Sequence, residues 1–298
     1  MIYQITHTTT YDYSTPVSLC QNITHLTPRP TPSQRVRHTA LVVNPQPAVV
    51  SNRTDYFGNA QTYFAVQEPH RTLTITASHV VEVDPRTPVD AAATPAWELV
   101  RDDLHTCRDA TNLEAYQFAL PSSHVPHSDS LRAYARPSFS PGRPIGDAVL
   151  DLVAQIHHDF QYDAAATTVA TPVEEVLQQR RGVCQDFAHL ALGCLRELGL
   201  AARYVSGYLR TLPPPGQSRL HGADATHAWL AVYCPSVGWF EVDPTNNTQP
   251  SDQHLILGWG RDFADVSPVK GVILGGDHHT VHVSVDVEEV ADSAASGC

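Results

Sequence analysis

The amino-acid sequence predicts an α+β fold, because strand-like and helix-like patterns occupy different stretches of the chain. Residues 1–85 hold short runs of alternating polar and apolar residues with prolines between them, which is typical of a β-sandwich-like domain. From residue 145 onward, apolar residues recur at the spacing of an α-helix, and further strand-like runs follow after residue 201. We therefore expect an N-terminal β domain and a C-terminal domain that combines helices with strands.

The strands of the N-terminal domain are expected at residues 2–13, 37–43, 61–66 and 73–83. In the last of these runs, apolar residues alternate with threonines, which places one face of the strand in a core and the other toward solvent. Residues 86–144 are rich in proline and are interpreted as a linker and a partly helical connection.

The third region, residues 145–298, is expected to begin with three helices. The first follows from the apolar spacing after residue 145, and the second from a Thr-Pro-Val-Glu start at residue 171. The third begins at Cys184 and ends before Gly199, a residue suited to the position after a helix. The strands that follow are expected at residues 202–210, 226–234, 238–242 and 280–288.

The net charge of −12, from 19 Lys and Arg against 31 Asp and Glu, argues against two classes of partner. Negative charge repels the phosphates of nucleic acids and the surface of anionic membranes. No run of 18 consecutive apolar residues is present, so we expect no transmembrane helix. The first residues lack the pattern of a signal peptide and the six cysteines form no CxxC pair, so we expect free thiols in the cytoplasm.

Cys184 lies where a helix is expected to begin. Residues 184, 187, 188, 191, 195 and 198 share one helical face, and all of them are apolar or cysteine. The positive end of the helix dipole stabilises a thiolate at such a position, and the free N–H groups face any anion that forms there. The pattern favours a nucleophilic cysteine with half of an oxyanion hole, and a buried, inert cysteine fits the segment about as well.

His227 and Asp243 lie at the same end of an expected hairpin, because one begins a strand and the other ends the next. A cysteine at a helix start that faces a histidine–aspartate pair supplies a nucleophile, a base and a group that orients the base. A single strand histidine is more often structural. The chain order Cys184, His227, Asp243 shifts the interpretation toward a triad.

The register of this hairpin is constrained if the triad forms. His227 and Asp243 share a face of the sheet only if the loop near residues 234–238 has an odd number of residues, or if a β-bulge restores the parity. Pro235 is expected in that loop, because proline cannot donate a hydrogen bond to a strand ladder. We also expect Asp243 to accept the Nδ1–H of His227, so that Nε2 faces the sulfur.

These segments resemble the core motif of the transglutaminase-like superfamily, specifically a bacterial and archaeal group of cysteine proteases with an N-terminal β domain. The pattern of that group reads GVCQDFAH, RYVSGY, HAW and DPTN, and this chain has all four, at residues 182–189, 203–208, 227–229 and 243–246. The start Tyr3-x-x-x-His7 also resembles that group's β domain. The resemblance covers nearly the whole chain.

The resemblance implies a papain-like core, in which the helix that bears Cys184 packs on an antiparallel sheet, with His227 and Asp243 completing the catalytic residues. The implied reaction is acyl transfer from a peptide or protein amide through a thioester, with no cofactor and no metal. Water as the acceptor makes a protease or amidase, which we favour; an amine makes a protein-glutamine transglutaminase or amide synthase. A non-catalytic binding module on the same fold is the alternative from a different class.

Four further residues are candidates for supporting roles. The second oxyanion donor of the superfamily usually lies upstream of the cysteine, which suggests Tyr162 or Gln178. Trp229 and Trp239 are candidates for the walls of the cleft, with packing in the core as an equal alternative.

Overall fold

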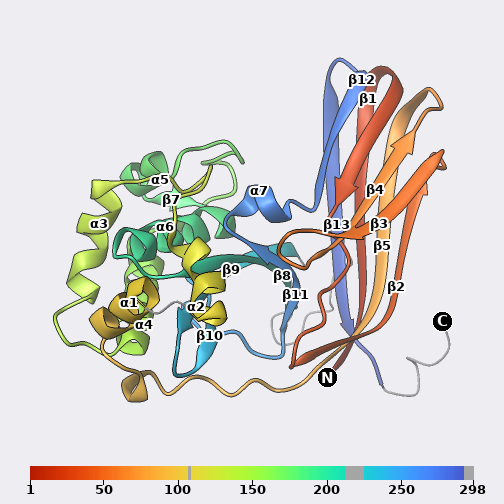
Figure 1. The fold of residues 1–298 in the computed structure, drawn as a ribbon. Coiled ribbons are helices and arrows are strands. Elements are labelled where there is room, and N and C mark those ends of the chain that lie inside the picture. Colours follow the sequence, from red (N-terminus) through yellow and green to blue (C-terminus); the bar gives the residue numbers. More distant parts are fainter. Residues whose placement is uncertain (107–108, 212–224, 292–298) are drawn as a thin grey trace, which may run out of the picture.

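The computed structural model describes residues 1–106, 109–211 and 225–291. A strand-rich part, drawn mostly in red, orange and blue, lies beside a part in which helices cover a smaller sheet (Figure 1). The expected α+β class with an N-terminal strand-rich domain is confirmed. Within the described ranges, no helix is long and apolar enough to cross a bilayer.

The strand-rich part is one sheet of seven strands that curls around its own core. The path runs β2-β5-β1-β4-β3, with β12 and β13 also paired to β1. The bounds are β1 Ile2–Thr24, β2 Gln34–Asn44, β3 Val49–Thr54, β4 Ala60–Val66, β5 His70–Val83, β12 Val269–Gly275 and β13 His279–Glu289.

The long strand β1 organises this sheet, because its two halves pair with different neighbours. Its first half pairs with β5 and β13, and its second half pairs with β4 and β12. The pairing with β5 is irregular between Asp12 and Val17, where an interrupted ladder lets a strand bend. Phe64 of β4 and Ile75 of β5 then meet in one apolar cluster, so the two halves face each other around a shared core.

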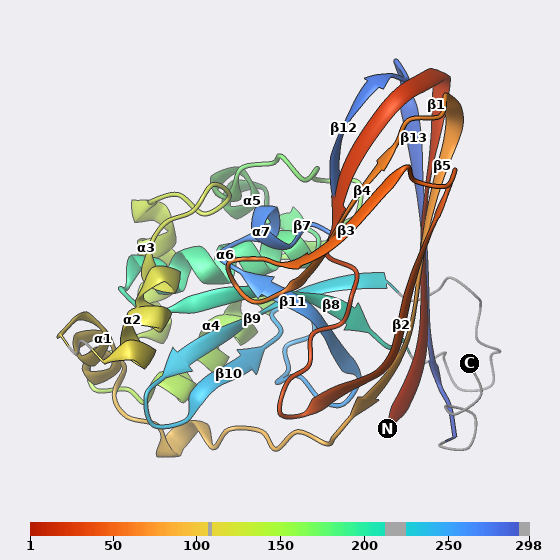
Figure 2. The same cartoon turned by 45° about the vertical axis from the view of Figure 1, so that its right-hand side comes forward.

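The C-terminal strands depart from the predicted domain division. Figure 2 shows β12 and β13, drawn in blue, running along β1 of the N-terminal sheet. The expectation that the third region extends as a unit to residue 298 was therefore wrong at its C-terminal end. Alternation predicts a strand, but it does not say which sheet the strand joins, because that choice depends on residues more than 250 positions away.

The second part contains the helices and a sheet of four antiparallel strands in the order β10-β9-β8-β11. The helices are α1 Trp97–Thr106, α2 Ala110–Tyr116, α3 Asp129–Ala135, α4 Ile145–Asp159, α5 Val173–Gln179, α6 Cys184–Glu197 and α7 Phe263–Val266, with 3₁₀ turns at Ala91–Ala93, Gln117–Ala119 and Arg136–Ser138. The strands are β8 Ala202–Leu209, β9 Ala225–Cys234, β10 Gly238–Val242 and β11 His254–Gly260, with a short parallel pair of β6 Gln161–Tyr162 and β7 Arg181–Gly182.

Helix α6 is the buried centre of this part, packed against β8 and β9. Its residues from 186 to 196 are all buried, because the sheet covers one side and α3, α4 and α5 cover others (Figure 1). The helix stops at Gly199, whose φ of +78° is costly for residues with a Cβ. The expected core, a cysteine-bearing helix on an antiparallel sheet, is thus present.

The hairpin of β9 and β10 confirms the predicted parity. Gly238 pairs with Cys234, so three residues, beginning with Pro235, form the loop. Continuing this register places Asp243 opposite Trp229 and diagonal to His227, on the same face of the sheet.

Candidate active site

Cys184 is the first residue of α6 and is half-buried. Its own backbone N–H is among those that have no partner inside the helix, so it faces outward at the positive end of the dipole. The site therefore offers both stabilisation of a thiolate and a hydrogen-bond donor for a developing oxyanion.

The start of α6 is fixed by Asp186, which is 3% exposed. Its carboxylate accepts the backbone N–H of Val183 at 2.8 Å and the hydroxyl of Thr167 at 2.6 Å. Burial is the larger effect and raises the pKa of Asp186, while these two hydrogen bonds act in the opposite direction. A Cβ at Gly182 would lie 2.6 Å from an oxygen of Asp186, so only glycine fits there. These contacts hold the backbone that leads into Cys184.

His227 bridges Cys184 and Asp243. Its Nε2 lies 2.7 Å from Oδ2 of Asp243, and its side chain also interacts with that of Cys184. Burial alone would lower the pKa of His227, but the hydrogen bonds to Asp243 and Cys184 raise it to about 10. The carboxylate of Asp243 therefore stabilises the protonated form of the imidazole.

The predicted assignment of the ring nitrogens was wrong. Nε2 faces Asp243, which leaves Nδ1 to face Cys184. The register of the hairpin explains the difference. Asp243 stands opposite Trp229 rather than His227, so its carboxylate approaches the histidine diagonally and meets Nε2, the ring nitrogen farther from the backbone.

Asp243 is completely buried and is surrounded by hydrogen-bond donors. Its Oδ2 lies near His227 Nε2, His254 Nε2 at 3.2 Å and the amide nitrogen of Asn246 at 2.7 Å. Its Oδ1 accepts the backbone N–H groups of Thr245 and Asn246. Burial favours the neutral acid, but these donors outweigh it and hold the pKa of Asp243 far below its usual range. The carboxylate is thus ionised inside the protein.

Two of these partners were missed by the sequence analysis. Asn246 is the last residue of the DPTN motif, so its position was visible although its role was not. His254 lies at the start of β11 and belongs to no motif. Its Nδ1 accepts the backbone N–H of Ser251, which leaves its Nε2–H to donate to Asp243.

The same side chains have the composition of a metal site, because ligand atoms of His227, Asp243 and His254 lie within 4.8 Å of one another. The hydrogen bonds from both histidines to Oδ2 of Asp243 already account for this proximity. The cluster is therefore explained as a network around one carboxylate.

Comparisons with known proteins identify the family of this chain. Residues 3–82 match the bacterial transglutaminase-like N-terminal region, and residues 132–244 match the transglutaminase-like superfamily. A full-length relative, an uncharacterized protein of Mycobacterium tuberculosis H37Rv, is 43% identical over 96% of this chain and 92% of its own length. The chain belongs to the transglutaminase-like superfamily.

Solved structures and shorter matches add to this assignment. A Cytophaga hutchinsonii protein described as a candidate cysteine protease has the same fold, with a TM-score of 0.77 and 22% identity over 98% of this chain and 92% of that one. A protein-glutamine gamma-glutamyltransferase of Pseudomonas aeruginosa is 36% identical over 33% of this chain and 16% of its own length. The peptide-N(4)-(N-acetyl-beta-glucosaminyl)asparagine amidase of Gallus gallus is 29% identical over 31% of this chain and 12% of its own.

In this transglutaminase-like core, the two tryptophans do not line the cleft beside Cys184. Trp229 is fully buried and stacks on His227 with ring centroids 5.9 Å apart, while its indole N–H donates to Glu241. Trp239 lies near the far end of the hairpin, against Arg203. The expectation of cleft walls was wrong, because both side chains point to the sheet face opposite α6. The alternative of packing describes both tryptophans, with Trp229 fully buried and Trp239 partly buried against the same cluster.

A cavity of about 300 Å³ opens at Cys184 and His227. Tyr162 lines it, and its ring is about half exposed. Burial is the main cause that raises the pKa of Tyr162, and the charge of Cys184, which lines the same cavity, adds to it. Gln178 is exposed on α5 and is not among the residues of this cavity. Of the two expected oxyanion donors, the fold brings only Tyr162 to the site.

Proposed function

We propose that this protein is a cysteine-dependent enzyme that breaks amide bonds by acyl transfer. In this proposal, Cys184 is the nucleophile, His227 is the acid–base group and Asp243 orients the histidine. The observation that carries it is the continuous contact from a buried, ionised Asp243 through His227 to a cysteine at a helix N-terminus. Structural cysteines rarely have such a partner.

The geometry supports the following steps. The Cys184 thiolate attacks the carbonyl carbon, a C–S bond forms, and the oxygen gains negative charge. The N–H of Cys184 donates to that oxygen, with the hydroxyl of Tyr162 as the second donor. The tetrahedral intermediate then collapses: the C–N bond breaks, and the proton on Nδ1 of His227 passes to the leaving amine. A thioester on Cys184 and a free amine result.

The acceptor of the acyl group decides the product. We favour water, which makes the enzyme a protease or amidase acting on peptide or protein amides, because water reaches the open cavity without a dedicated binding site. The local similarity to a gamma-glutamyltransferase favours a second candidate, transfer to an amine. The same triad serves both reactions, so the difference lies in access to the thioester.

The first test asks whether Cys184 is a reactive thiolate at all. Iodoacetamide is added near pH 6.5, and alkylation of each cysteine is followed by mass spectrometry. We expect Cys184 to react much faster than Cys194 and Cys234, which are buried and serve as internal controls. Equal, slow reaction of all three would support a non-catalytic binding module in place of an enzyme.

The second test separates the two acceptors. A peptide library is incubated with the protein, with and without a primary amine, and the products are identified by mass spectrometry. If peptides are cleaved or deamidated to the same extent with and without the amine, the result supports hydrolysis. If products that contain the amine form in place of the hydrolysed ones, the result supports transfer. The Cys184→Ala protein is the control, and products that persist in it would refute the assignment.

A further inference from the structure

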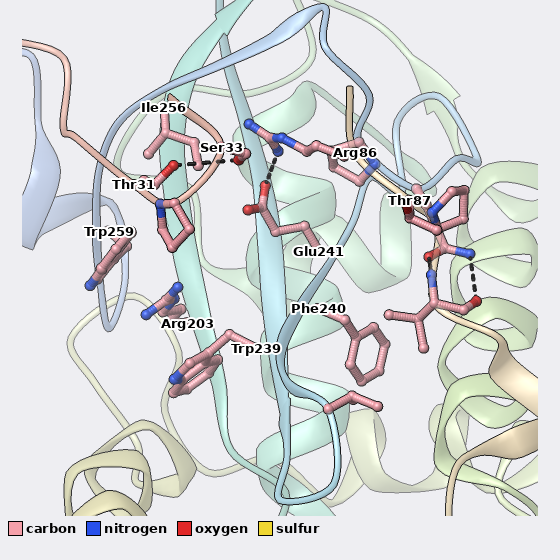
Figure 3. Close-up of a pocket in the computed structure, with 16 residues that line it drawn as sticks. Thr31, Ser33, Arg86, Thr87, Arg203, Trp239, Phe240, Glu241, Ile256 and Trp259 are labelled. Carbon is pink, nitrogen blue, oxygen red and sulfur yellow. Dashed lines mark hydrogen bonds and ion pairs between the residues drawn. The ribbon is translucent and has the colours of Figure 1, made fainter. Parts of the chain in front are cut away.

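A second cavity, of about 470 Å³, lies on the face of the four-stranded sheet opposite α6. Its walls come from residues 31–33 and 86–89 and from strands β8, β10 and β11. Figure 3 shows Arg86 with Glu241 toward one end of it, and Arg203 beside Trp239 and Trp259 toward the other. The proposed reaction uses none of these residues.

Arg203 is the unusual member of this cavity. Its guanidinium carbon lies 3.7 Å from the ring centroid of Trp259 and 4.4 Å from that of Trp239. Its Nε is buried without a hydrogen-bond partner, and no carboxylate in the described parts of the chain forms an ion pair with it. Burial lowers the pKa of Arg203 to about 9, although Glu241 acts against this effect. Arg203 is half-buried, and leaving the buried Nε of a cation without an acceptor is costly, so this end of the cavity suits an acceptor.

Glu241 forms its ion pair with Arg86 and none with Arg203. Its Oε2 receives hydrogen bonds from Arg86 at 2.9 Å and from the indole of Trp229 at 2.6 Å. The second terminal nitrogen of Arg86 donates to the carbonyl oxygen of His254. The lining therefore carries one more positive than negative charge.

We propose that this cavity binds a carboxylate attached to an apolar body, and that Arg203 recognises the carboxylate. The two indoles cover the guanidinium, so an acceptor must approach its edge, and a planar carboxylate matches two N–H donors there. Val89 and Ile256 supply apolar wall around the polar groups. The volume is that of a typical small-ligand site. The inference does not depend on the proposed reaction.

Two sources present this chemistry: a free organic acid, and the carboxyl terminus of a peptide. We would measure binding by calorimetry and by tryptophan fluorescence, using Cys184→Ala protein so that no turnover intervenes. The probes are 3-phenylpropionate and N-acetyl-Ala-Ala-Phe, and the controls are their neutral amides. We expect each amide to bind about tenfold more weakly or worse than its acid. Preference for the tripeptide identifies a peptide terminus, and equal or better binding of 3-phenylpropionate identifies a small acid.

The variant that tests Arg203 directly is Arg203→Met, which keeps the length of the side chain and removes its charge. We expect acid binding to weaken about tenfold or more. The matched control is Arg101→Met, which removes an arginine that lies 5.2 Å from the ring of Trp97, beside a different cavity. If Arg203→Met does not fold, Arg203→Lys keeps the charge without the paired donors and is expected to weaken binding several-fold.

Three results would overturn the proposal. They are equal binding of acid and amide, full affinity for the acids in the folded Arg203 variant, and no binding of either acid at about 5 mM. None of these measurements depends on turnover. A result that overturns the carboxylate site would therefore leave the proposed enzymatic activity untouched, and the reverse also holds.

Discussion

Replacing Asp243 by asparagine tests the network at the centre of the candidate active site. In the wild type, Oδ2 lies near nitrogen donors of His227, His254 and Asn246, while Oδ1 accepts two backbone N–H groups. An asparagine retains one oxygen for the backbone but presents an NH₂ group to the other donors. Each hydrogen bond to a charged acceptor contributes about 1.5–3 kcal/mol, and these losses are not additive. We expect the free energy of unfolding to fall by about 3–5 kcal/mol.

The substitution also changes the tautomer of His227. To accept from the new amide, Nε2 must lose its proton, which places the remaining proton on Nδ1 and removes the base from Cys184. The corresponding change in serine protease triads costs about 10⁴-fold in turnover. Here we expect alkylation of Cys184 by iodoacetamide near pH 6.5 to slow about tenfold or more.

Both effects of Asp243→Asn are measurable without a known substrate. Guanidinium chloride unfolding, followed by tryptophan fluorescence, gives the stability, and mass spectrometry gives the alkylation rate. The control is Asp129→Asn, at a side chain that is 98% exposed, which should change stability by less than about 1 kcal/mol. A loss below about 1 kcal/mol in Asp243→Asn together with wild-type alkylation would refute the network as described.

Three further outcomes follow from the same site. Cys184→Ala should abolish turnover while changing the free energy of unfolding by only about 1–2 kcal/mol, and turnover that persists would exclude Cys184 as the nucleophile. His254→Phe keeps a ring against Trp229 and removes one donor to Asp243; we expect a loss of about 1–3 kcal/mol in urea unfolding, smaller than for Asp243→Asn. In the Cys184→Ala protein, the hydrogen bond to Asp243 still raises the pKa of His227, so the folded chain keeps a proton that the unfolded chain releases as the pH rises above 6.5. The free energy of unfolding should therefore fall over that range, and adding His227→Gln should flatten the slope.

The parts of the site that follow local periodicity could be predicted from the sequence. Helical spacing placed Cys184 at a helix start, and the alternation of two strands placed His227 and Asp243 at one end of a hairpin. Both inferences need only the geometry of a single element or of two adjacent ones. The odd loop at Pro235 followed from the same reasoning.

The parts that depend on distant contacts could not be predicted. His254 reaches Asp243 because β11 pairs with β8, across more than 40 residues, and nothing marks it among 17 histidines. Arg203 belongs to a motif segment, but its two indole neighbours come from β10 and β11. The placement of β12 and β13 on β1 likewise depends on pairing between opposite ends of the chain.

The three-residue loop between β9 and β10 determines which side chains of the hairpin reach the two cavities. Because its loop has three residues, Glu241 and Asp243 lie on the same face as Trp229 and His227. Asp243 then holds His227 toward Cys184, while Glu241 holds Trp229 behind the histidine and binds Arg86 in the second cavity. The opposite face of the same strands is apolar and packs under α6. A loop longer by one residue would turn both carboxylates into that apolar layer. The odd number of loop residues that positions the candidate triad therefore also determines the charge of the second cavity.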